Sequence, residues 1–300
     1  MKVKKKSYAK INLALNVTNK TKPSWMHDLD MINLTLSLYD EVGLKIIKNK
    51  NNQINITCNN PSVPTDESNF VYKVVKQYQK VFKKDFSCNI DIKKNIPLES
   101  GLGGGSSNAT TVLELLDMYF ETNMTDKQKV SLLEKISSDS AYFVYSPYIA
   151  RVKGTGSNVN IISSHLNYKV ALIKPKSGCS TKEVYGSLDY PKLVHPNINK
   201  VIEAIENNDF ELLKKHCFNS LQDSAMKLND DIKETIQRLE CCGFEIVLLT
   251  GSGSTCFAIS NKNLAYTRLK ELFAKEKYEL VGIYNIKNGI KLLWFLIKYI

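Results

Sequence analysis

The sequence predicts an α+β fold, and three observations lead to this prediction. Alternating apolar residues over 8–18 indicate a half-buried strand, whereas apolar residues at helical spacing over 68–83 indicate an amphipathic helix. Further strand and helix patterns follow without strict βαβ alternation. The length of 300 residues, 43% of them hydrophobic, suits one large or two medium domains with real cores.

The first part of the chain is predicted to be rich in strands. In the strand at 8–18, the apolar residues face one way, and Lys10 and Asn12 lie side by side on the other face. A polar loop is expected at 19–30 and a helix at 68–83. Additional strands are expected at 32–38, 40–47, 53–58 and 89–93.

The rest of the chain mixes helices and strands. A helix at about 126–137 is expected to begin at Thr125 or Asp126, because both residue types cap helix N-termini well. The composition changes near 160–167, which predicts domains of residues 1–162 and 163–300. Strands are expected at 148–153, 168–174, 245–249, 256–259 and 278–284, two short helices within 196–216, and helices at 229–241 and 262–276.

The net charge of +11 comes from 41 basic and 30 acidic residues. A basic chain can bind nucleic acid, membranes or phosphorylated ligands, but scattered lysines are more typical of a solvated surface. Seven cysteines without a C-x-x-C pair indicate reduced thiols and a cytoplasmic protein, and the four histidines show no metal spacing. The apolar segment 290–300 is too short to span a bilayer, so we expect it to dock on the core. Membrane-surface binding is the less favoured alternative.

The most informative segment is Pro97-Leu98-Glu99-Ser100-Gly101-Leu102-Gly103-Gly104-Gly105-Ser106-Ser107-Asn108-Ala109. It places four glycines directly before a helical apolar pattern, where unpaired backbone N–H groups and the helix dipole attract anions. A plain flexible turn is the alternative, but such a turn rarely needs four glycines. The loop lacks the Gly-Lys-Ser/Thr of a Walker A motif, and Ser106 occupies the third glycine position of the dinucleotide fingerprint. It is therefore predicted to bind phosphate with a cation supplied from elsewhere in the chain.

Two charged residues are candidates to act beside this loop. A lone lysine on a strand usually belongs to a solvated face, but the phosphate loop needs a cation, which makes Lys10 the strongest candidate among the lysines. Asp139 is placed by the pattern near a helix C-terminus, where a carboxylate is electrostatically unfavourable. A residue held against its local preference is a candidate for function, although turn formation is the simpler explanation.

A second glycine loop, Thr250-Gly251-Ser252-Gly253-Ser254-Thr255, lies between two predicted strands. It is either a tight hairpin or a second wall of the phosphate site.

Together these segments resemble the motifs of the GHMP small-molecule kinases. The loop at 97–107 resembles the central motif of that superfamily, and residues 249–255 resemble its C-terminal glycine motif. Within the superfamily, the chain is most similar to the 4-diphosphocytidyl-2-C-methyl-D-erythritol kinases of the non-mevalonate isoprenoid pathway. The segments that carry this resemblance are Tyr8-Ala9-Lys10-Ile11-Asn12-Leu13, His27 with the strand ending at Glu41, Gly103 to Ala109, and Lys176 to Tyr185. Met26 stands where the family has a tyrosine against the cytosine ring, and Trp25 is the alternative ring there.

The resemblance implies a ribosomal-protein-S5-like N-terminal domain, a ferredoxin-like C-terminal domain and an active site between them. The implied reaction transfers the γ-phosphoryl group of ATP, with Mg²⁺, to the 2-hydroxyl of 4-diphosphocytidyl-2-C-methyl-D-erythritol. The catalytic residues would be Lys10, which neutralises charge, and Asp139, which accepts or orients the hydroxyl proton. By the same resemblance, the cytidine end would be held by Asn12, His27, Thr181 and Tyr185. The implied ATP-binding residues are Lys94 beside the adenine and Pro97, Leu98, Glu99, Ser100, Gly101, Leu102, Gly103, Gly104, Gly105, Ser106 and Ser107 around the phosphates, with Ser106 or Ser107 at Mg²⁺.

Three alternatives stay open at this point. The same chemistry could act on another alcohol, such as mevalonate or homoserine, although residues 176–185 argue against this. A non-catalytic nucleotide-binding regulator is disfavoured by the retention of both Lys10 and Asp139. An RNA-binding role lacks a basic motif with interleaved aromatic residues. The expected partner is therefore a small molecule, a cytidine diphosphate-linked polyol, with no nucleic acid and no stable membrane association; the sequence leaves the oligomeric state open.

Overall fold

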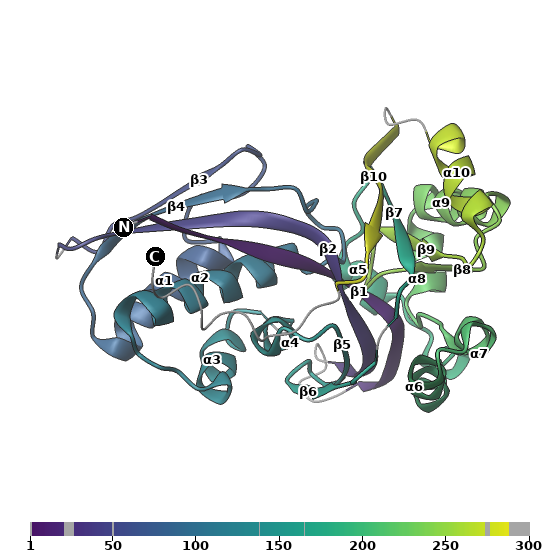
Figure 1. Ribbon diagram of the computed structural model, residues 1–300, viewed down its shortest axis with the longest axis horizontal. Helices are drawn as coiled ribbons and strands as arrows, with labels where there is room; N and C mark the ends of the chain where they lie inside the picture. Colours follow the sequence, from purple (N-terminus) through teal and green to yellow (C-terminus); the bar gives the residue numbers. More distant parts are fainter. Residues whose placement is uncertain are drawn as a thin grey trace.

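The computed structural model describes residues 2–20, 27–49, 51–137, 139–164, 166–273 and 277–287. It confirms the α+β class. The chain forms two sheets, each with its own helices, and these two parts lie side by side along the molecule (Figure 1). The predictions for Trp25, Met26 and the tail at 290–300 concern residues outside the described ranges.

The first sheet has the strand order β3-β4-β2-β5-β6, with β1 paired to β2. Its strands are β1 (Lys2–Lys20), β2 (His27–Ile47), β3 (Ile54–Cys58), β4 (Ser87–Lys93), β5 (Ile149–Gly154) and β6 (Asn158–Ile161). Two predictions were wrong here. The strands expected at 32–38 and 40–47 form one continuous strand, β2, and strand pairing also extends into the expected loop at 19–30. Strand β2 is paired with β1, β4 and β5, and these backbone hydrogen bonds keep it extended where its sequence is polar. The sequence pattern of one strand does not show such pairing.

Four helices accompany this sheet: α1 (Phe70–Phe82), α2 (Gly104–Phe120), α3 (Asp126–Leu133) and α4 (Ser140–Tyr145). The buried faces of α1 and α2 share one apolar cluster with β2, β3 and β4. Thr125 caps α3, and its side chain and that of Gln128 accept hydrogen bonds from each other's backbone N–H groups. The predicted start of this helix is therefore confirmed, but it ends at Leu133, earlier than expected.

The second sheet has the order β10-β7-β9-β8. Its strands are β7 (Lys169–Pro175), β8 (Ile246–Leu249), β9 (Cys256–Ile259) and β10 (Tyr278–Asn285). Its helices are α5 (Thr181–Gly186), α6 (Ile198–Asn207), α7 (Phe210–His216), α8 (Gln222–Leu228), α9 (Asp230–Cys241) and α10 (Asn263–Leu272), with a 3₁₀ turn at Tyr190–Lys192. The sequence did not predict α5 and α8, because six or seven residues are too few to establish a helical period.

The two sheets share part of their core. One apolar cluster joins Ile11 and Leu34 of the first sheet to Leu172 and Phe257 of the second. The last strand of the first sheet ends at Ile161 and the first strand of the second begins at Lys169. We propose the domain boundary at 162/163 because this connection separates the two sheets.

All seven cysteines are free. In the described part of the chain, no helix has the length and apolar character needed to cross a membrane.

Candidate active site

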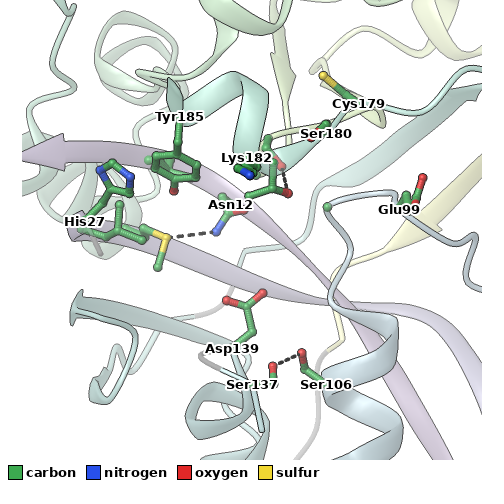
Figure 2. Close-up of a pocket in the computed structure, with 18 of the residues that line it drawn as sticks. Asn12, His27, Glu99, Ser106, Ser137, Asp139, Cys179, Ser180, Lys182 and Tyr185 are labelled. Atoms are coloured by element: carbon green, nitrogen blue, oxygen red, sulfur yellow. Dashed lines mark hydrogen bonds between the residues drawn. The ribbon is translucent and has the colours of Figure 1, made fainter. Parts of the chain in front are cut away.

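A cavity of about 1010 Å³ opens between the two sheets (Figure 2). Its described lining comes from β1, β2, both glycine loops, the first turn of α2, the turns before α4 and between β5 and β6, and α5 with the residues just before it. The predicted site residues among this lining are Lys10, Asn12, His27, Glu99, Gly101, Ser106, Asp139, Thr181 and Tyr185. The remaining predicted loop residues and Lys94 are not among the described residues that line it.

The first glycine loop leads into α2 through left-handed backbone. Gly101 and Gly103 have φ of +71° and +70°, and Glu99 has φ of +46° although it is not glycine. Gly103 is the N-cap of α2, and no side chain caps this helix end. The first turn of α2 therefore keeps backbone N–H groups without a side-chain acceptor, as an anion site requires.

The second glycine loop forms the hairpin that the sequence allowed, and it also lines part of the cavity wall. It joins the paired strands β8 and β9, so it is a hairpin. It also packs on the first loop: the Ser254 N–H donates to the Glu99 carbonyl at 3.4 Å, and the Thr250 hydroxyl donates to the Gly101 carbonyl at 3.4 Å. A Cβ on Gly101 would lie 2.1 Å from the Thr250 carbonyl oxygen. The absence of a side chain at Gly101 therefore allows the two loops to touch.

The two loop serines point to different surroundings. Ser106 lines the cavity, and its hydroxyl lies 2.5 Å from that of Ser137 (Figure 2). Ser107 is 3% exposed, and its Oγ accepts a hydrogen bond from the Ser7 hydroxyl at 2.8 Å. Of the two serines considered for Mg²⁺, Ser106 is the one beside the cavity.

Lys10, Asn12 and Asp139 form a polar cluster at the centre of the cavity. The Lys10 Nζ donates to Asn12 Oδ1 at 2.9 Å and lies 3.5 Å from Asp139 Oδ2. Asn12 in turn donates to Asn33 Oδ1 at 2.7 Å, and its backbone N–H donates to the Thr250 hydroxyl at 3.1 Å. Lys10 is only 3% exposed, so these contacts hold its ammonium group in one place.

Asp139 is close to Lys10, as expected, but the prediction that it lies near a helix C-terminus was wrong. Helix α3 ends at Leu133, and Asp139 is instead the N-cap of α4 without a side-chain capping bond. A carboxylate is electrostatically favoured at a helix N-terminus. Because its side chain makes no cap, it stays directed at Lys10 and the cavity.

Lys94 lies under the glycine loop rather than on the cavity wall. Its ammonium group forms a buried ion pair with Asp40, whose side chain is fully buried. Asp40 also accepts from the backbone N–H groups of Asn95 and Ile96. A Cβ on Gly104 would lie 2.7 Å from Lys94 Nζ, so Lys94 supports the first turn of α2 from inside the protein.

The far end of the cavity is aromatic. The rings of His27 and Tyr185 stack with centroids 4.2 Å apart and an interplanar angle of 24°. His27 Nδ1 lies 2.7 Å from the Tyr190 hydroxyl, and Thr181 Oγ1 lies 2.7 Å from Ser252 Oγ. Burial, with smaller contributions from Asp139 and Tyr190, raises the pKa of Tyr185 and keeps its phenol neutral.

Sequence reasoning missed several residues of this site. Thr250 holds Asn12, Ser252 holds Thr181, and Lys182 lines the cavity between the two helix positions that were predicted. Thr250 and Ser252 belong to a glycine loop that the sequence analysis identified, but the sequence did not show that this loop packs against Asn12 and Thr181. Lys182 had a usable signal, since it lies three residues before Tyr185 on one helix.

The described residues contain no group of three or more His, Cys, Asp or Glu side chains able to hold a metal ion. Mg²⁺ at phosphate sites commonly needs only one or two protein ligands, with phosphates and waters supplying the rest. The paired hydroxyls of Ser106 and Ser137 are oxygen donors of this kind, so the cavity fits Mg²⁺ brought with a nucleotide.

Comparison with known proteins identifies the class. Residues 69–146 match the family model of the GHMP kinases N terminal domain, and residues 201–276 match that of the GHMP kinases C terminal domain. The protein is thus a small-molecule kinase with the GHMP fold.

Its relatives are more specific. A 4-diphosphocytidyl-2-C-methyl-D-erythritol kinase of Clostridium novyi is 36% identical over 279 residues, which cover 93% of this chain and 98% of the relative. A kinase of the same name from Clostridium perfringens is 34% identical over 283 residues, 94% of this chain and 96% of the relative. The chain belongs to the 4-diphosphocytidyl-2-C-methyl-D-erythritol kinase family.

Solved structures agree on the fold. A crystal structure of 4-(cytidine 5'-diphospho)-2C-methyl-D-erythritol kinase superposes with a TM-score of 0.78 at 21% identity, covering 96% of this chain and all of that one. A homoserine kinase from Cytophaga hutchinsonii superposes with a TM-score of 0.71 at 17% identity, covering 95% and 96% of the two chains.

Proposed function

We propose that this protein transfers the γ-phosphoryl group of ATP to the 2-hydroxyl of 4-diphosphocytidyl-2-C-methyl-D-erythritol. One observation carries the proposal: the Lys10–Asp139 pair lies in the same cavity as a glycine loop and a stacked aromatic pair. The glycine loop suits the phosphates of a phosphoryl donor, and the aromatic pair suits the nucleobase of a nucleotide-linked alcohol. Both lie in one cavity with the Lys10–Asp139 pair, where the phosphoryl group can pass from one to the other.

ATP binds with its phosphates at the first turn of α2. The backbone N–H groups after Gly103 and the positive end of the helix dipole hold the anionic oxygens. Mg²⁺, when bound with ATP near Ser106, neutralises part of the phosphate charge.

Lys10 and Asp139 act on the reacting atoms. Phosphoryl transfer has a loose transition state, so catalysis depends on placing the groups and neutralising charge. Lys10 stabilises negative charge on the transferred group, and its attachment to Asn12 prevents it from moving away. Asp139, 3.5 Å from that ammonium, orients the hydroxyl and accepts its proton.

The cytidine end lies against the aromatic pair. A flat base can stack on the His27 and Tyr185 rings, and base–aromatic stacking contributes about 1–3 kcal/mol. Asn12 and Thr181 provide further polar groups in the same cavity, and each is held by a residue of the second glycine loop.

The proposal is tested by measuring ADP release with purified protein and ATP. The cytidine substrate, mevalonate and homoserine are offered in parallel at equal concentration, together with a reaction without acceptor. We expect ADP release above background only with the cytidine substrate. Faster release with mevalonate or homoserine would assign the same chemistry to another alcohol, and no acceptor-dependent release would contradict the proposal.

A further inference from the structure

We propose that Lys182 binds the diphosphate of the cytidine substrate and makes the protein select a diphosphate-linked acceptor over an uncharged nucleoside. This inference rests on the proposed function, because it names which part of that substrate one further side chain recognises.

The position of Lys182 follows from the geometry of α5. Residues three and four apart on a helix share a face, so Lys182 and Thr181 lie on the face of Tyr185. All three line the cavity, and the Tyr185 ring is stacked on His27. In the view of Figure 2, the Lys182 amino group lies above Asn12, on the side of Asn12 away from Tyr185. Lys182 therefore lines the same cavity as Tyr185 at the base end and Asp139 at the reacting end.

The substrate places its charge between these two ends. Its diphosphate joins the cytidine to the methylerythritol, so a base at Tyr185 and a hydroxyl at Asp139 leave the two phosphates between them. Lys10, the other lysine among the described lining residues, is 3% exposed and already contacts Asn12 and Asp139. Its charge is committed to the transferred phosphoryl group.

Lys182 has the properties of a ligand contact. It is exposed within the cavity, and in the described part of the chain no carboxylate forms an ion pair with it. The neighbouring Glu183 is not among the described lining residues. An ammonium group on a long side chain can reach phosphate oxygens and donate charge-assisted hydrogen bonds to them.

The test compares the binding of CDP and cytidine, measured by calorimetry, to the wild type and to Lys182→Gln. We expect the variant to bind CDP about tenfold more weakly, as for a lost hydrogen bond to a charged group, and cytidine with unchanged affinity. Lys182→Arg should keep most of the CDP affinity, since it retains the charge. Lys176→Gln is the matched control, because Lys176 is an exposed lysine on the same segment outside the described lining.

Kinetics give a second readout. In Lys182→Gln the KM for the cytidine substrate should rise about tenfold, with kcat and the KM for ATP nearly unchanged. Equal CDP affinity in the wild type and Lys182→Gln would overturn the inference, and so would a rise in the KM for ATP alone. If the wild type binds CDP but does not phosphorylate the cytidine substrate, the proposed function fails while the binding comparison still decides the role of Lys182.

Discussion

At the glycine-loop end of the cavity the wall is backbone held by buried contacts, whereas at the other end it is made of side chains, with His27 on β2 and Tyr185 on the short, largely exposed helix α5. The loop end rests on the buried Lys94–Asp40 pair and on the touching backbones of Gly101 and Thr250. The other end rests on the His27–Tyr185 ring stack, the contact of His27 with the Tyr190 hydroxyl and the contact of Thr181 with Ser252.

This contrast has a physical reason. At the proposed ATP site, backbone N–H groups can hold phosphate oxygens only if the backbone is rigid, so the structure of the loop and phosphate binding should depend on each other. The side chains proposed to recognise the base are partly exposed, so changing one of them should disturb the core less. Substitutions at the loop end should therefore affect folding and ATP together, and those at the base end should affect the acceptor alone.

The largest expected effect is at Asp139, which lies beside Lys10 in the polar cluster of the cavity. Asp139→Asn keeps the shape of the side chain but removes the proton acceptor and the charge beside Lys10. We expect kcat to fall about 10²–10⁴-fold, with ATP still bound and the melting temperature nearly unchanged. Steady-state kinetics, ATP titration and thermal melting measure the three quantities. An active, destabilised variant would show instead that Asp139 only supports the start of α4.

Lys94→Met should show that the loop end depends on its support. Breaking a buried pair leaves the Asp40 carboxylate uncompensated, so we expect the free energy of unfolding to fall by about 3–5 kcal/mol. Lys93→Met is the matched control, since the Lys93 side chain is 62% exposed and its pair with Glu41 should contribute little. Denaturant unfolding measures both. A loss of ATP affinity at unchanged stability would support the predicted contact of Lys94 with adenine.

Gly101→Ala tests whether the two loops must touch. Alanine at positive φ costs about 1–2 kcal/mol, and here its Cβ would also lie 2.1 Å from the Thr250 carbonyl oxygen. We expect a stability loss together with at least about tenfold weaker ATP binding. Gly243→Ala separates the two causes, because Gly243 has φ of +91° and open space around it. If both variants bound ATP equally well, contact between the loops would be irrelevant to the phosphate site.

The smallest expected effect is at the base end. Tyr185→Ala should raise the KM for the cytidine substrate about tenfold and leave the KM for ATP nearly unchanged, because stacking contributes about 1–3 kcal/mol. Tyr185→Phe keeps the ring and should behave nearly like the wild type. Equal losses for ATP and the cytidine substrate would remove the distinction between the two ends.

Much of this protein could be predicted from local patterns. The alternation over 8–18 correctly placed Lys10 and Asn12 on one face of a strand, because side-chain direction in a strand depends only on its period of two. Glycine before an apolar helical pattern likewise marked a helix N-terminus, although the helix begins at Gly104 and so includes the last two glycines of the loop. Both signals are local, and the α+β class follows from adding such segments.

Only the tertiary structure decided which of these segments meet. Lys10 and Asp139 are 129 positions apart, Gly101 and Thr250 are 149 apart, and no periodicity encodes such contacts. Packing placed Ser106 beside the cavity and Ser107 inside the protein, and it placed Lys94 beneath the loop. The sequence by itself determined which groups could bind phosphate or move a proton. Burial and long-range pairing determined which of them face the cavity, because those depend on the whole chain closing around one core.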